Sequence, residues 1–123
     1  MASQLESLGV EGPFNFTAAE VDAKVLQHRV GSYVLGKMED KRFKVSYVGR
    51  SDSDLNAELK KGLPLGYSQF MFSYARSRED AFMKEAKNYH FFGGRKLDNK
   101  RHPERPNGLN NLECPVEGCT ELQ

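Results

Sequence analysis

The chain has 123 residues, the length of one domain that can bury a core of its own. Apolar residues make up 38% and charged residues 28% of it, a composition typical of a globular protein, and no apolar run approaches the roughly 20 residues of a membrane span. The formal net charge of +1 conceals an uneven distribution, because residues 76–106 carry nine Lys and Arg against five Asp and Glu. Such a basic zone favours contact with phosphates, and a solvated charged face is the ordinary alternative.

The cysteines and the first residues bear on the cellular compartment. Two cysteines are too few for a disulfide scaffold. Met1-Ala2-Ser3-Gln4 does not begin a basic stretch followed by an apolar one, so the sequence predicts no secretory signal. We therefore expect a cytoplasmic protein that does not bind membranes.

The first predicted helix begins after Thr17, whose side chain can accept a hydrogen bond from the backbone N–H of Glu20. Gly31 is expected to end this helix, which places His28 and Arg29 in its last turn, where cations suit the helix dipole. His28 is interpreted as a helix-end residue and not as a ligand.

The sequence then changes to the two-residue period of strands. Tyr33–Leu35 and Phe43–Val48 are predicted as two strands, and Glu39-Asp40-Lys41 as the polar turn of a hairpin between them. Simple alternation places three side chains on one face of the second strand: Phe43, Val45 and Tyr47.

A short helix and a third strand follow. Ser51, Asp52 or Ser53 can cap a helix that buries Leu55 and Leu59, and Gly62 is expected to end it in the left-handed conformation. Alternating aromatic residues then predict a third strand over residues 70–75.

The last predicted helix begins after Ser77 and ends at Gly93-Gly94. Its spacing places Glu85 beside the buried stripe, where packing can hold a carboxylate that still reaches solvent or a metal. Beyond Gly94 the sequence is rich in turn residues and offers few apolar anchors, so this segment needs something else to hold it.

Two short motifs, Gly31-Ser32-Tyr33 and Tyr47-Val48-Gly49, lie in the two strands of the predicted hairpin. With Glu85 and Asn99 further along, the chain from Gly31 to Asn99 resembles the GIY-YIG nuclease superfamily. The resemblance implies an α/β (α+β) fold with a small, mainly antiparallel sheet of three strands flanked by helices. It also implies one domain over residues 1–123: a helical extension (1–30), the core (31–99) and an irregular C-terminal segment (100–123).

The resemblance also implies roles for individual residues. Tyr33 and Tyr47 correspond to the motif tyrosines, Gly49 to the motif glycine at the substrate, Glu85 to the ligand of Mg²⁺ or Mn²⁺, and Asn99 to the terminal asparagine. A phenol has a pKa of about 10, so Tyr33 can act as a general base only if a cation lowers that pKa; otherwise it can only orient water.

The family's helix arginine has no counterpart in this chain. Its expected position falls near Ala57 or Glu58, neither of which can donate to a phosphate. Four side chains could take its place by geometry: Arg50, Arg76, Lys60 and Lys61. A planar guanidinium is difficult to replace, since it both orients a phosphate and neutralises its charge.

A second group of residues suggests a structural metal. Cys114, Cys119, His90 and His102 could form a tetrahedral Zn²⁺ site that anchors the C-terminal segment. The four residues between the two cysteines exceed the usual two, and two free thiols or an oxidised pair are the alternatives.

These patterns predict a metal-dependent endonuclease that hydrolyses DNA phosphodiester bonds. A catalytically inactive GIY-YIG-like module that binds nucleic acid is the alternative, favoured by the missing helix arginine. A protein-interaction domain that ignores nucleic acid is a third. The sequence does not indicate the oligomeric state.

Overall fold

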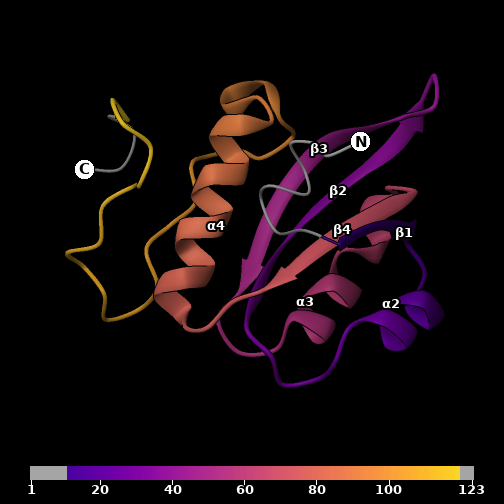
Figure 1. Cartoon of the computed structure of the whole chain (residues 1–123), viewed down its shortest axis with the longest axis horizontal. Coiled ribbons are helices and arrows are strands. Elements are labelled where there is room, and N and C mark those ends of the chain that lie inside the picture. Colours follow the sequence, from indigo (N-terminus) through magenta and orange to yellow (C-terminus); the bar gives the residue numbers. More distant parts are fainter. Residues whose placement is uncertain (1–10, 120–123) are drawn as a thin grey trace.

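The computed structural model describes residues 11–119 and contains a four-stranded antiparallel sheet covered by helices on both faces (Figure 1). The sheet order is β1-β4-β2-β3. Its strands are β1 (Glu11–Asn15), β2 (Gly31–Glu39), β3 (Arg42–Ser51) and β4 (Gln69–Tyr74). The α+β class is confirmed. The predicted number of three strands is wrong, because β1 adds a fourth strand at one edge.

Strand β1 lies in the segment that the sequence assigned to a helical extension. It pairs antiparallel with β4, where Phe14 lies opposite Phe70. Gly12 and Pro13 interrupt any regular pattern in this five-residue strand, and Pro is typical of edge strands because it cannot donate to a neighbour. Residues 1–10 of the predicted N-terminal extension, and residues 120–123, lie outside the described part of the chain.

The helices are α2 (Ala18–Lys24), α3 (Leu55–Lys61) and α4 (Arg78–Phe91), with single 3₁₀ turns at Leu63–Leu65 (η1) and Gly94–Lys96 (η2). Helices α2 and α3 cover one face of the sheet and α4 covers the other (Figure 1). Within residues 11–119, no helix is both long enough and apolar enough to cross a membrane.

Short polar side chains cap the first turns of the helices. Thr17 accepts from Glu20 N–H at 3.1 Å, and Ser77 accepts from Asp80 N–H at 3.0 Å, both as the sequence predicts. Asp54, rather than one of residues 51–53, caps α3 by accepting from Ala57 N–H at 3.2 Å.

Two predicted helix ends are wrong. Helix α2 ends at Lys24, so His28 and Arg29 lie in the connection to β2, where His28 takes a φ of 63°. Gly62 ends α3 with a right-handed φ of −83° and not in the left-handed region.

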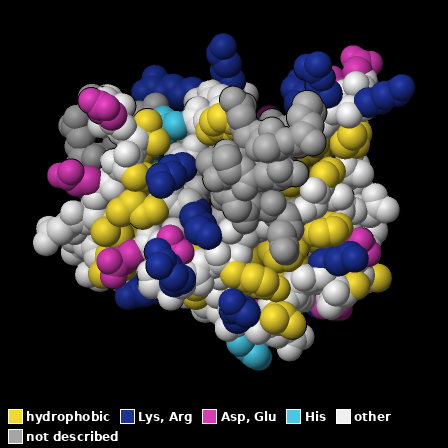
Figure 2. Space-filling model, viewed as in Figure 1, with side chains coloured by type: hydrophobic (Ala, Val, Ile, Leu, Met, Phe, Trp, Pro, Cys, Tyr) yellow, Lys and Arg dark blue, Asp and Glu magenta, His cyan; other side chains and the backbone are white. Residues whose placement is uncertain are grey.

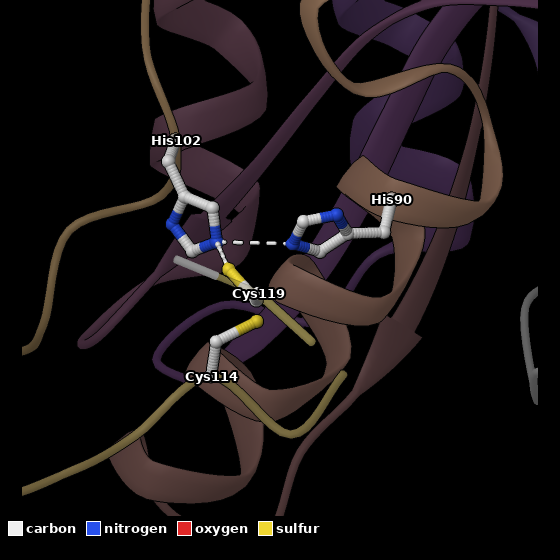
Figure 3. Close-up of side chains that lie close together, drawn as sticks. All are labelled: His90, His102, Cys114 and Cys119. Atoms are coloured by element: carbon white, nitrogen blue, oxygen red, sulfur yellow. Dashed lines mark hydrogen bonds between the residues drawn. The ribbon is translucent and has the colours of Figure 1, made fainter. Parts of the chain in front are cut away.

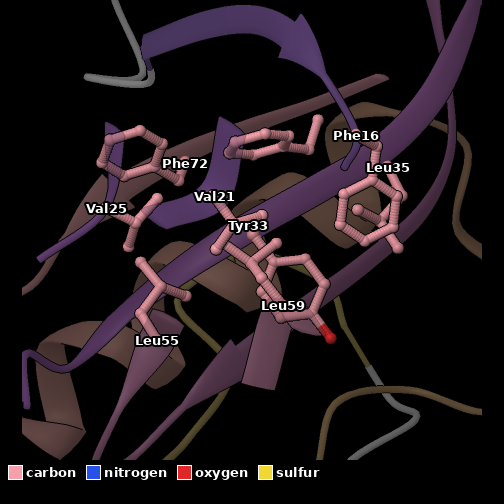
Figure 4. Close-up of a cluster of buried hydrophobic side chains, with 9 residues drawn as sticks. Phe16, Val21, Val25, Tyr33, Leu35, Leu55, Leu59 and Phe72 are labelled. Carbon is pink, nitrogen blue, oxygen red and sulfur yellow. The ribbon is translucent and has the colours of Figure 1, made fainter. Parts of the chain in front are cut away.

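Each face of the sheet has its own apolar cluster. The cluster under α2 and α3 contains Val21, Leu55, Leu59 and the aromatic side chains of β4 (Figure 4). The cluster under α4 contains Val34, Val48, Met71, Tyr89 and Leu97. Alternate residues of the central strands β2 and β4 therefore serve opposite cores, because successive side chains of a strand point to opposite faces.

A β-bulge at Ser46 decides where Tyr47 lies. Leu35 pairs with Tyr47, but Gly36 pairs with Val45, so Ser46 has no partner across the ladder. Phe43 and Val45 consequently pack under α4, whereas Tyr47 packs on the α3 side with Tyr33. The prediction that Phe43, Val45 and Tyr47 share a face is wrong, since an inserted residue shifts the alternation.

The C-terminal segment beyond η2 has no helix or strand within the described residues and runs along the outer side of α4 (Figure 1). Arg78 of α4 donates to the Asn107 carbonyl at 2.9 Å, which ties the segment to the start of the helix. In the view of Figure 2, Lys and Arg side chains lie along the upper edge of the molecule, above the end of α4 and the β2–β3 hairpin, and others are spread over its middle and lower part.

Candidate functional site

Tyr33 lies across the β2–β3 ladder from Gly49. A Cβ added at Gly49 would lie 2.4 Å from the Tyr33 hydroxyl oxygen, so a glycine is needed for the ring to pass over β3. Tyr33 is 4% exposed, and its hydroxyl points away from the apolar cluster (Figure 4). The motif glycine therefore makes room for the motif tyrosine.

Burial raises the pKa of Tyr33, and Tyr47, Glu58 and Glu85 raise it further. Burial also raises the pKa of Tyr47, together with Glu85 and Glu58. Among the described residues no cation lowers the pKa of Tyr33 against these effects, so the phenol stays protonated at neutral pH. Tyr33 can orient water or donate a hydrogen bond, but the proposed role of general base does not fit.

Tyr47 and Glu85 line one pocket of about 410 Å³, which we name the Tyr47 pocket. The two residues come from opposite faces of the sheet, because Tyr47 packs on the α3 side and Glu85 belongs to α4. They meet at β3, which is an edge strand. Further lining residues include Leu65, Tyr67, Lys100 and Arg101.

Arg50 forms the main contact of the Glu85 carboxylate. Its Nη1 donates to Glu85 Oε1 at 2.7 Å, and its Nε donates to Asp52 Oδ1 at 2.8 Å. The guanidinium also lies 5.5 Å from the Phe82 ring centroid. Since the Arg50 and Glu85 side chains are only 12% and 10% exposed, this pair is poorly screened by solvent.

Burial raises the pKa of Glu85 to about 7, against the opposing effect of Arg50. Asp52 and Glu58 contribute to the rise. The carboxyl group therefore changes its charge near neutral pH. Such a shifted group in a pocket is a recognised indicator of a functional site.

The four candidates for the missing arginine lie in different places. Arg50 lies beside Glu85, as one of the sequence alternatives requires. Arg76 is 93% exposed and pairs with Asp80 at 3.9 Å, Lys60 pairs with Asp22, and Lys61 pairs with Glu58 at 3.8 Å. None of the four lines the Tyr47 pocket, but Arg50 contacts Glu85, which does. Glu58, at the expected arginine position, brings negative charge toward the tyrosines.

Asn99 holds the chain against β3. Its side-chain oxygen accepts from Val48 N–H at 2.9 Å and its amide nitrogen donates to the Val48 carbonyl at 2.8 Å. The adjacent Asp98 N–H donates to the Ser46 carbonyl at 2.7 Å. Asn99 thus lines the pocket but acts mainly as a clamp on the strand that carries the second motif.

Sequence reasoning missed part of the pocket wall. Tyr67 donates from its hydroxyl to Asp98, which joins the loop before β4 to the segment after η2. Lys100 and Arg101 were not singled out, although they belong to the basic zone of residues 76–106. The charge count could have identified them, whereas the contribution of the loop at Leu65 and Tyr67 depends on tertiary packing.

His90, His102, Cys114 and Cys119 form a separate cluster that could hold a metal ion. One ligand atom from each lies within 4.8 Å of all the others. The two His Nε2 atoms are 3.2 Å apart, and Cys119 Sγ lies 3.4 Å from His102 Nε2 (Figure 3). Both cysteines are free thiols, so the oxidised pair is not the arrangement here.

The surroundings of His102 orient its ring. Its Nδ1 lies 2.8 Å from the Pro103 carbonyl oxygen, so Nδ1–H is the donor and Nε2 keeps the lone pair that a metal needs. His102 is 8% exposed, and its ring meets Tyr89 edge-on at 5.2 Å. The turn-rich segment thus holds the His102 imidazole in a fixed orientation toward the His90 imidazole of α4.

Comparison with known proteins gave no relatives: no protein-family model, no curated protein and no solved structure matches the chain.

Proposed function

We propose that the protein is a metal-dependent endonuclease that hydrolyses DNA phosphodiester bonds at the Tyr47 pocket. The observation that carries this proposal is the shared pocket of Tyr47 and Glu85, whose wall also contains Lys100 and Arg101. A phenol, a carboxylate and cations around one cavity are the groups that a phosphodiester substrate requires.

Each residue has a defined task in this proposal. Lys100 and Arg101 attract the phosphate, Tyr47 donates a hydrogen bond to it or to the attacking water, and Arg50 holds Glu85 in place. A protonated Tyr47 is suited to donation because its pKa is raised. Tyr33 is not among the described residues that line the pocket; it lies across the β2–β3 ladder from Gly49 and supports the position of β3.

Glu85 is the residue that would hold Mg²⁺ or Mn²⁺. Among the described residues, its hydrogen bonds and ion pairs use Oε1 only, which leaves Oε2 for a hard cation. When bound, such an ion polarises the phosphoryl oxygen and stabilises the leaving alkoxide. The ionised carboxylate is required, so we expect activity to rise with pH through about 7.

A plasmid-nicking assay with Mg²⁺ or Mn²⁺ tests this function. We expect the wild-type protein to nick supercoiled DNA and Glu85→Gln to be slower by roughly 100-fold or more. Glu79→Gln is the matched control, since Glu79 is an exposed residue in the first turn of the same helix. Equal nicking by wild type and Glu85→Gln would reject Glu85 as the metal ligand.

A catalytically inactive nucleic-acid-binding module is the second candidate. Two observations favour it. Arg50 already forms ion pairs with both Glu85 and Asp52, and Glu58, an acidic residue, occupies the expected position of the arginine. This candidate predicts DNA binding that weakens steeply between about 50 and 200 mM salt, with no cleavage in either metal.

We also propose that the cluster of His90, His102, Cys114 and Cys119 binds one structural Zn²⁺. Two imidazoles and two thiolates form a common tetrahedral donor set, with Zn–N near 2.0 Å and Zn–S near 2.3 Å as rough values. The His–His and His–Cys separations of 3.2 and 3.4 Å suit ligands around one ion. Such an ion would anchor the segment that follows η2.

Metal analysis of the purified protein tests the zinc proposal. We expect about one equivalent of zinc in the wild type and a large loss in the double variant Cys114→Ser/Cys119→Ser. Less than about a tenth of an equivalent in the wild type would reject the proposal.

A further inference from the structure

A second pocket adjoins the Tyr47 pocket. It has a volume of about 610 Å³, and we name it the Arg95 pocket after a cationic residue that lines it and does not line the Tyr47 pocket. Asn99, Lys100 and Arg101 line both pockets. The two pockets therefore lie next to each other, on either side of a shared wall formed by these three residues.

The shared wall is held at both ends. At its first residue, Asn99 is clamped to Val48 by two hydrogen bonds of 2.9 and 2.8 Å. After it, His102 belongs to the metal-ligand cluster and is oriented by the Pro103 carbonyl. Lys100 and Arg101 therefore extend from a short stretch of backbone whose two neighbours are fixed, which limits the ordering cost of binding.

The charge of the Arg95 pocket suits a polyanion. Three cations, Arg95, Lys100 and Arg101, line it with one acidic residue, Glu104. Glu104 pairs with Arg101 at 3.2 Å, but the two side chains are 66% and 81% exposed, so this pair is weak and can yield to a phosphate. No ion pair engages Lys100 within residues 11–119.

The surface around these residues is basic as well. Figure 2 shows Lys and Arg side chains along the edge above the end of α4, where η2 and the following segment lie. Cations spread over an edge, rather than enclosed in a deep cavity, match a ligand that carries several phosphates.

We propose that the Arg95 pocket binds a backbone phosphate of the same polynucleotide whose neighbouring phosphate enters the Tyr47 pocket. This inference rests on the proposed function and adds a subsite that sets the position of the nucleic-acid strand. The ligand is a polynucleotide rather than a free phosphate, because two adjoining pockets share one basic wall.

DNA binding by fluorescence anisotropy at about 50, 100 and 200 mM salt tests the subsite. For Arg95→Ala, which changes a residue of the Arg95 pocket and not of the Tyr47 pocket, we expect the affinity to fall about threefold or more at 50 mM and the salt dependence to lose a slope of roughly one. Lys37→Ala removes the same charge from an exposed position on the hairpin and is expected to change both the affinity and the salt dependence much less. Circular dichroism melts establish that all variants fold.

Two results would overturn the subsite: equal losses in Arg95→Ala and Lys37→Ala, which would indicate a general effect of charge, or unchanged binding in Arg95→Ala. Displacement of DNA by a few millimolar inorganic phosphate would also contradict it, because a free phosphate would then be the preferred ligand. These outcomes are independent of catalysis, since the nicking assay with Glu85→Gln reports separately on hydrolysis.

Discussion

At the scale of residues, the site depends on one buried carboxyl group between opposing influences. Removal from water favours the neutral form of Glu85, and the Arg50 guanidinium at 2.7 Å favours the charged form. The first influence is larger, so the pKa rises to about 7. A cation that reaches Oε2 would reverse this balance and favour ionisation.

This balance predicts how stability depends on pH. A carboxyl group with a folded-state pKa near 7 binds more protons when folded than when unfolded between about pH 4.5 and 7. Its contribution to the free energy of unfolding is therefore greatest below that range and is lost as the pH rises through 7. We expect Glu85→Gln, which does not titrate there, to gain up to roughly 3 kcal/mol relative to wild type between pH 5 and 8.

Urea denaturation of the two proteins at pH 5 and pH 8 measures this difference. Glu79→Gln serves as the control, because Glu79 is exposed at the start of the same helix. A difference between Glu85→Gln and wild type that stays constant across the range would show that Glu85 titrates normally.

At the scale of elements, periodicity identified the pieces that are regular and missed those that depend on distant partners. The β2–β3 hairpin and α4 follow from alternation, caps and closing glycines. The bulge at Ser46 does not, because it requires Gly36 on the opposite strand, where an added Cβ would lie 1.9 Å from the Lys44 carbonyl oxygen. Strand β1 likewise exists only through its pairing with β4.

The segment after η2 is the element that most needs an external anchor. Leu97, His102, Pro103 and Pro106 are its buried residues within the described chain, too few to hold about twenty residues by apolar burial alone. We therefore expect a zinc chelator to expose this segment to trypsin after Lys100 and Arg101 while the sheet stays protected. Limited proteolysis followed by mass spectrometry measures the effect.

The variant Cys114→Ser/Cys119→Ser provides the comparison for that experiment. It should be cleaved in the same segment without any chelator, because it lacks two of the four ligands. Identical protection of the wild type with and without chelator would contradict a structural role for a metal in this part of the fold.

At the scale of the whole molecule, the sequence predicted which residues belong to the site better than it predicted how those residues lie relative to one another. The metal-ligand cluster was predicted from residue types, and the structure brings all four together. Arg50 was one of four candidates, and only the fold separates it from Arg76, Lys60 and Lys61, which pair elsewhere. The Tyr47 pocket joins two faces of the sheet around an edge strand, a relation that no local pattern contains.

The endonuclease proposal predicts that a cation and a phosphate meet at Glu85. Anomalous diffraction at the manganese edge, from crystals grown with Mn²⁺ and a short DNA duplex, tests this directly. We expect a peak within about 2.5 Å of the Glu85 carboxylate, with a DNA phosphate beside it. DNA bound to the protein with no manganese at Glu85, and with the Arg50–Glu85 pair intact, would contradict the proposal.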